Sequence, residues 1–90
     1  MKFLITYDIA DDGRRNRLVR LLNEYGRRVQ YSCFEVSLNP ESLSLLKGKI
    51  EEVIIPEEDS VFIFPITEFA LPFAVKLGVV EPSVGDSEVL

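Results

Sequence analysis

One acidic side chain, Asp8, stands at the end of the first apolar run of this chain. It follows residues 3–7, FLITY, and precedes a charged stretch that begins at Asp11. A carboxylate after a strand often caps the next helix, but Asp11 and Asp12 lie nearer to the start of that helix. We therefore predict a functional role for Asp8. One carboxylate with bound waters suits a Mg²⁺ site, and Mg²⁺ can activate water toward a phosphodiester.

Arginines follow this carboxylate closely. Six of the ten positive charges fall within 15 residues, and all six are arginines: Arg14, Arg15, Arg17, Arg20, Arg27 and Arg28. A guanidinium binds phosphate through two hydrogen bonds, so the cluster indicates either a polyanion site or, alternatively, a solvated helix face. The acidic runs 51–52 and 57–59 are read as solvated surface, which would repel nucleic acid and confine it to the arginine side.

The chain contains no histidine and one cysteine, Cys33. The lack of histidine excludes Ser–His and Cys–His nucleophile pairs, a histidine general base and histidine-bound zinc. Cys33 is read as a small apolar residue because its neighbours are apolar and β-prone. Since no signal-peptide pattern and no bilayer-length apolar run is present, we predict a cytoplasmic protein with no membrane association.

Periodicity and turn residues predict one α+β domain over residues 1–78 and a loosely ordered tail over 79–90. Residues 28–38 form either one bent strand or two strands in a tight hairpin around 30–32, and periodicity does not decide between these. The remaining predicted elements are a strand over 2–9, a helix capped by Asp11 or Asp12 and stopped by Gly26, a helix that starts at Asn39-Pro40 and ends before Pro56, a strand over 60–66, and a short strand over 73–78. This order predicts a ferredoxin-like βαββαβ sandwich with a short extra C-terminal strand.

The sheet of such a sandwich has one face that its two helices cannot cover. The strands over 2–9 and 60–66 are apolar on both faces, and 47% of the residues are hydrophobic in a chain of only 90. We therefore predict a homodimer whose sheets face each other. Two Asp8 carboxylates that approach across the two-fold axis would raise the pKa of one of them or hold a cation between them.

Two motifs resemble a known family. They are Tyr7-Asp8-Ile9-Ala10-Asp11-Asp12 followed by Arg14-Arg15-Asn16-Arg17, and Tyr25-Gly26-Arg27-Arg28-Val29-Gln30-Tyr31-Ser32-Cys33-Phe34-Glu35. The sequence is similar, up to about residue 78, to the smaller of the two core adaptation proteins of CRISPR systems, the CRISPR-associated small endoribonucleases. The resemblance implies a ferredoxin-like homodimer, which in some members cleaves single-stranded RNA or double-stranded DNA with Mg²⁺ or Mn²⁺. It also implies a spacer-acquisition complex in which this dimer bridges two pairs of the integrase subunit and supports the incoming DNA.

The resemblance also assigns roles to single residues. The metal-binding aspartate of the family falls on Asp8, and its activity-supporting residues fall on Tyr7, Arg15, Arg17, Arg28 and Phe34. From residue type alone, Tyr7 and Phe34 are instead read as core or interface aromatics. The family's last strand, which commonly pairs with the partner's sheet, falls on residues 73–78. Cys33 stands where the family usually has an aliphatic residue, and residues 79–90 match no family pattern.

Three functions remain open at this point. The first is a metal-dependent endonuclease that uses Asp8, and the second is a non-catalytic scaffold for integrase and DNA in which the arginines matter and Asp8 does not. The third is a small-molecule regulatory module on the same fold, which would have no use for six clustered arginines. The sequence does not separate RNA from DNA as the substrate.

Overall fold

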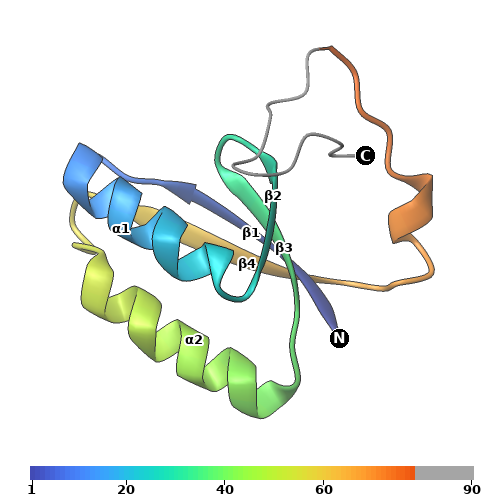
Figure 1. The fold of residues 1–90 in the computed structure, drawn as a ribbon, viewed down its shortest axis with the longest axis horizontal. Coiled ribbons are helices and arrows are strands. Elements are labelled where there is room, and N and C mark those ends of the chain that lie inside the picture. Colours follow the sequence, from blue (N-terminus) through green and yellow to red (C-terminus); the bar gives the residue numbers. More distant parts are fainter. Residues whose placement is uncertain (79–90) are drawn as a thin grey trace.

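In the computed structural model, which describes residues 1–78, the first apolar run forms strand β1 (Lys2–Asp8) in the interior of an antiparallel sheet. The strand order is β2-β3-β1-β4, with β2 over Gly26–Gln30, β3 over Cys33–Ser37 and β4 over Ser60–Ile66 (Figure 1). Residue 5 of β1 pairs with residue 34 of β3 and residue 63 of β4, so the hydrophobic positions of the three strands lie in one row.

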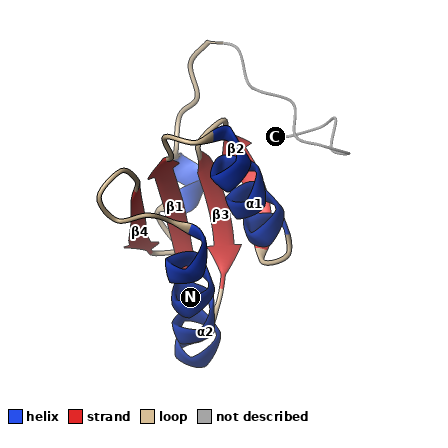
Figure 2. Cartoon of the chain, turned by 90° about the vertical axis from the view of Figure 1, so that its left-hand side faces the viewer, coloured by secondary structure: helices blue, strands red, loops and turns tan. Residues whose placement is uncertain are grey.

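Two helices cover one face of this sheet (Figure 2). Helix α1 (Asp12–Asn23) begins after Asp11, whose carboxylate accepts a hydrogen bond from the Arg14 backbone amide. Helix α2 (Pro40–Val53) begins after Asn39, which accepts one from the Ser42 amide. These caps satisfy N–H groups that have no partner inside the helix, as the sequence predicts. Over residues 1–78, no helix is both long enough and apolar enough to cross a membrane.

The core lies between the helices and the sheet. Its buried side chains are Phe3, Ile5, Tyr7 and Ile9, together with Leu18 and Leu22 of α1, Phe34, Val36 and Leu38, and Leu46 and Ile50 of α2. On the other face of the sheet, Phe62 and Phe64 of β4 are 62% and 46% exposed, and their rings stack with centroids 5.4 Å apart. The prediction that this face keeps apolar side chains uncovered in the single chain is therefore confirmed.

The hairpin alternative for residues 28–38 is confirmed. Strands β2 and β3 pair as a hairpin, and the register shifts between Arg28 and Gln30, which gives β2 an irregularity near the turn. Tyr31 and Ser32 form the tip between the two strands. Bulges of this kind commonly change the direction of nearby side chains and are frequent next to functional sites.

The predicted strand over residues 73–78 is wrong for the single chain. Leu71–Phe73 forms a short 3-10 helix, and residues 74–77 have no regular secondary structure. Pro72 favours that helical turn because its φ is fixed and it has no N–H to donate to a strand. A strand also needs a neighbouring edge to pair with, and this segment pairs with neither β2 nor β4, the edges of the chain's own sheet. The tail predicted over residues 79–90 lies outside the described residues.

Candidate metal and phosphate site

Asp8 is the last residue of β1, pairs in register with Ser60 of β4, and is exposed. Two hollows meet at its carboxylate. One of about 360 Å³ lies on the open face of the sheet, and its lining includes Thr6, Cys33, Ser60 and Phe62. The other, of about 600 Å³, is lined by residues of α1 and of the β2–β3 hairpin. The carboxylate is therefore accessible to a ligand from two sides.

The larger hollow, which we call the arginine hollow, is lined by Arg15 and Arg28 as well as by Asp8. Its lining consists of Tyr7, Asp8, Ile9, Arg15, Asn16, Val19, Arg28, Tyr31 and Ser32. Arg15 donates to the backbone oxygen of Ile9 over 3.1 Å and to the exposed Asp12 carboxylate over 2.6 Å. The guanidinium of Arg28 lies over the Phe34 ring, 5.7 Å from its centroid. The arginine hollow is thus lined by Asp8 and by arginines from two different elements, α1 and β2.

The donor set around Asp8 fits a sparsely ligated magnesium ion. Within residues 1–78, no group of three or more acidic, cysteine or histidine side chains could enclose a metal. Among residues 1–78, Asp8 is the one carboxylate that lines either hollow, and Thr6, Ser32 and Ser60, which carry hydroxyls, line the smaller one. Mg²⁺ is commonly held by one or two carboxylates with its remaining positions filled by water and substrate phosphate, so this set suffices.

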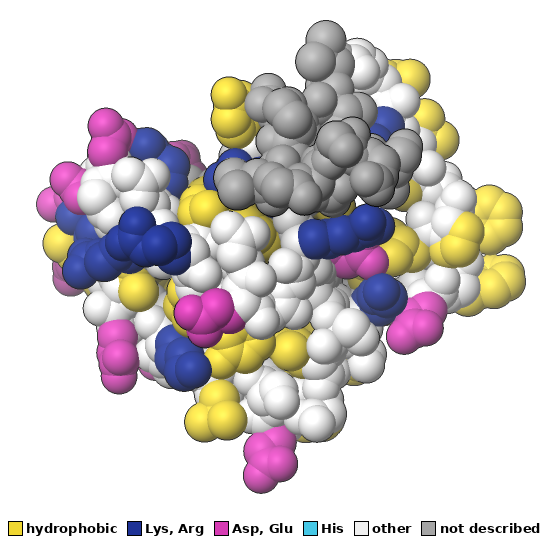
Figure 3. Space-filling model, in the orientation of Figure 1, with side chains coloured by type: hydrophobic (Ala, Val, Ile, Leu, Met, Phe, Trp, Pro, Cys, Tyr) yellow, Lys and Arg dark blue, Asp and Glu magenta, His cyan; other side chains and the backbone are white. Residues whose placement is uncertain are grey.

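The other four arginines do not line the arginine hollow. Arg14 pairs with Asp59 and Glu58, and Arg27, on the open face, lies 3.6 Å from Glu35. Arg17 and Arg20 are exposed on α1 and line neither hollow at Asp8. Figure 3 shows basic side chains over α1. The arginines that are clustered in the sequence are therefore dispersed in space, and Arg14 uses its donors within the protein.

Tyr7 and Phe34 belong to the buried core, and Tyr7 directly precedes Asp8 in β1. Both are buried, and their rings lie 6.3 Å apart. The Tyr7 hydroxyl donates to the backbone oxygen of Tyr31 over 2.8 Å, and the Tyr7 amide donates to that of Ser32 over 3.1 Å. Their burial agrees with the interpretation from residue type as core aromatics. Tyr7 thereby fixes the hairpin tip next to Asp8.

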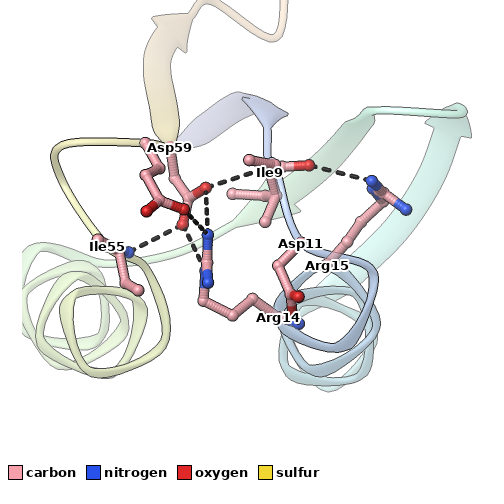
Figure 4. A network of polar contacts seen from close by, with 8 residues as sticks. Ile9, Asp11, Arg14, Arg15, Ile55 and Asp59 are labelled. Carbon is pink, nitrogen blue, oxygen red and sulfur yellow. Dashed lines mark hydrogen bonds and ion pairs between the residues drawn. The ribbon is translucent and has the colours of Figure 1, made fainter.

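Asp59 is a buried acid that sequence reasoning placed wrongly on the solvated surface (Figure 4). Its side chain is inaccessible to solvent, accepts from the amides of Ala10 and Ile55 over 2.9 and 2.8 Å, and accepts from Arg14 Nε over 2.8 Å. The hydrogen-bonded guanidinium holds the pKa of the Asp59 carboxyl well below its usual range, and the two amides lower that pKa further. The sequence feature that could have indicated the burial of Asp59 is its position directly before an apolar strand. Through Ala10, this network fixes the chain that leaves Asp8.

Cys33 is half-buried at the start of β3. Burial raises the pKa of its thiol, and the negative charge of Glu35 raises it further. A thiol with a raised pKa carries little thiolate at neutral pH, and the thiolate is the nucleophile and the metal ligand. This agrees with the prediction that Cys33 is a small apolar residue.

The fold and the site together define a class. The chain is a small ferredoxin-like α+β protein with a single carboxylate at the end of β1 and arginines from α1 and β2 beside it. Residues 1–70 match the family described as CRISPR associated protein Cas2, and the chain belongs to this family. The family expected from the two motifs is confirmed.

Curated relatives and solved structures agree with this assignment. The chain is 39% identical to CRISPR-associated endoribonuclease Cas2 3 of Synechocystis over 77% of this chain and 75% of that protein. It is 41% identical to CRISPR-associated endoribonuclease Cas2 1 of Archaeoglobus fulgidus over 76% and 73%. Crystalline Streptococcus pyogenes Cas2 matches with a TM-score of 0.81 and 28% identity over 87% of this chain and 100% of that one. A chain of a partial Cas6-RT-Cas1–Cas2 complex matches with a TM-score of 0.69 and 27% identity over 97% and 94%.

Proposed function

We propose that this protein is a metal-dependent phosphodiesterase of CRISPR adaptation. It cuts single-stranded RNA or double-stranded DNA, with Asp8 as the residue that holds the metal ion. The observation that carries the proposal is that the exposed residue Asp8 lines one hollow together with Arg15 and Arg28. The names of the relatives, endoribonuclease and endonuclease, support nuclease chemistry in general. A cytoplasmic location stays a prediction.

Each residue has a defined task in this proposal. Asp8 would hold Mg²⁺ or Mn²⁺, which polarises a phosphoryl oxygen and lowers the pKa of bound water. Arg15 and Arg28 hold the phosphate next to Asp8 and stabilise the negative charge that grows on it. Arg17 is exposed on α1 and lines neither hollow, so its task is to contact the nucleic-acid backbone further along.

Replacement of Asp8 by alanine is expected to lower the cleavage rate by about 100-fold or more, because the cation loses its protein carboxylate. The measurement is cleavage of labelled single-stranded RNA and duplex DNA, with and without chelator, by identically purified proteins. Glu51→Ala is the matched control, since Glu51 is an exposed carboxylate on α2, outside both hollows. Equal activity of wild type and Asp8→Ala would disprove catalysis by this protein.

A non-catalytic scaffold is the second candidate, favoured by the presence of a single carboxylate at the site within the described part of the chain, residues 1–78. We propose that the dimer joins the integrase subunit and the incoming DNA. A structure neighbour that is part of a Cas1–Cas2 complex supports this partner. The scaffold role predicts that Asp8→Ala still supports spacer acquisition, whereas the double variant Arg15→Ala/Arg28→Ala does not.

The proposed homodimer uses the open face of the sheet. The double variant Phe62→Ser/Phe64→Ser is expected to be monomeric, because these two exposed rings supply the apolar centre of that face. Size-exclusion chromatography with light scattering measures the mass. Leu45→Ser is the matched control, since Leu45 is 62% exposed but lies on α2, on the covered side of the sheet. A dimer that persists in the double variant would place the interface elsewhere.

A further inference from the structure

An exposed aromatic ring stands beside the arginine hollow. Tyr31 at the tip of the β2–β3 hairpin is 65% exposed and lines both hollows that meet at Asp8. Within residues 1–78, its ring packs against no other aromatic ring. At this position, beside a hollow that is lined by two arginines, the Tyr31 ring offers an apolar face to a ligand in the hollow.

The backbone below this ring is fixed. The Tyr31 and Ser32 carbonyl oxygens accept hydrogen bonds from the hydroxyl and the amide of Tyr7, over 2.8 and 3.1 Å. Since Tyr7 is buried and belongs to the interior strand β1, these bonds tether the hairpin tip to the strand that carries Asp8. Anchoring of this kind lowers the entropy that the tip loses when it binds a ligand.

The neighbouring groups identify the chemistry of that ligand. Arg15 and Arg28 line the same hollow as Tyr31, and a guanidinium can bind a phosphate through two hydrogen bonds. A nucleotide carries a phosphate on one side of its sugar and a flat base on the other, and an unpaired base can stack on a side chain without the loss of a base pair. We infer that Tyr31 is a nucleobase-stacking residue, which selects strands with an unpaired base while Arg15 and Arg28 hold the phosphate. This inference rests on the proposed action on nucleic acid.

The test measures binding without cleavage. In the Asp8→Ala background and without divalent cations, Tyr31→Leu, Tyr31→Phe and Phe69→Leu are compared by fluorescence anisotropy. Phe69 is the matched control because it is an 81% exposed aromatic outside both hollows at Asp8. The probes are a single-stranded RNA of roughly 12 nucleotides, the same sugar–phosphate chain without bases, and the corresponding duplex.

Stacking gives a distinct pattern across these probes. Tyr31→Leu is expected to weaken binding of the single-stranded RNA by about tenfold and to change binding of the abasic chain and the duplex by less than about twofold. Tyr31→Phe keeps the ring and therefore the affinity, as does Phe69→Leu. Unchanged RNA binding by Tyr31→Leu, or equal losses on the RNA and the abasic chain, would overturn the inference.

The remaining outcomes separate this inference from the proposed catalysis. A loss of the dimer in Tyr31→Leu, seen by light scattering, would make Tyr31 an interface residue and overturn the stacking role. If the Asp8→Ala background binds none of the probes, the stacking role is overturned together with nucleic-acid binding. If Tyr31-dependent binding is found but wild type cuts nothing, the stacking role stands and only the catalytic proposal fails.

Discussion

Gly26→Ala is expected to leave the chain unfolded under ordinary conditions. Gly26 opens β2 and pairs with Val36 of β3, so its Cα faces the backbone of the neighbouring strand. A methyl group here would overlap the backbone carbonyl oxygen of Glu35 and lie 2.6 Å from Cγ1 of Val36. A backbone atom cannot rotate away as a side chain can, so β2 and β3 would have to separate.

The expected loss is large compared with the stability of a small domain. Overpacking in a core typically costs about 1–3 kcal/mol, and forced separation of two paired strands exceeds that range, against a total of roughly 5–15 kcal/mol. The measurement is the circular dichroism spectrum without denaturant, and the urea unfolding midpoint of each protein that gives a folded spectrum. Gly48→Ala is the control, since nothing lies within 4 Å of the added atom and α2 would gain up to about 1 kcal/mol. A Gly26→Ala protein with a midpoint near that of wild type would show that the hairpin is not packed as described.

Asp59→Asn is expected to lower Tm by at least about 10 °C, because it leaves the Arg14 guanidinium without its buried counter-charge. The amide also offers one acceptor oxygen in place of two, whereas Arg14, Ala10 and Ile55 all donate to Asp59. Glu58→Gln is the matched control. It removes the other partner of Arg14, but Glu58 is 56% exposed and its loss is expected to change Tm little.

The same substitution has a defined pH dependence. The pKa of Asp59 is lowered in the folded chain, so the carboxylate contributes its full stability above the unfolded pKa of about 4, and the contribution declines as pH falls toward the folded pKa. The Tm difference between wild type and Asp59→Asn should therefore be constant near neutrality and narrow below about pH 4. A constant difference down to the most acidic folded condition would contradict the role of the buried ion pair.

Local signals in the sequence predicted most of the fold. Three of these signals depend only on nearby residues: the acid at position 11, the Asn39-Pro40 pair and the alternation in the first strand. The structure confirms the caps and the strand that they predict. The hairpin stayed undecided because one bent strand and two short strands share the same alternation. The predicted strand over 73–78 failed because extended structure depends on a partner edge, which no local pattern reports.

The site was predicted less completely than the fold. Asp8 was singled out because it had no capping task, and its role stays a prediction, whereas the arginines were counted as one cluster although the structure disperses them. Consecutive residues of a helix point about 100° apart and those of a strand point to opposite faces, so Arg14 and Arg15 diverge, as do Arg27 and Arg28. Asp59 was missed because its burial depends on Arg14, which lies 45 residues earlier in the chain.

The strand order has a consequence for synthesis of the protein. Strand β1 is made first and lies between β3 and β4, yet β4 begins only at Ser60. In a growing chain that ends before Asp59, the edge of β1 that will pair with β4 has no partner. Arg14 also lacks the carboxylate with which it forms an ion pair in the folded chain. Open strand edges favour aggregation, and closing so long a loop is slow. Residues 1–66 contain all four strands of the described sheet, so we expect a chain that ends before β4 to be more prone to aggregation than one that includes it.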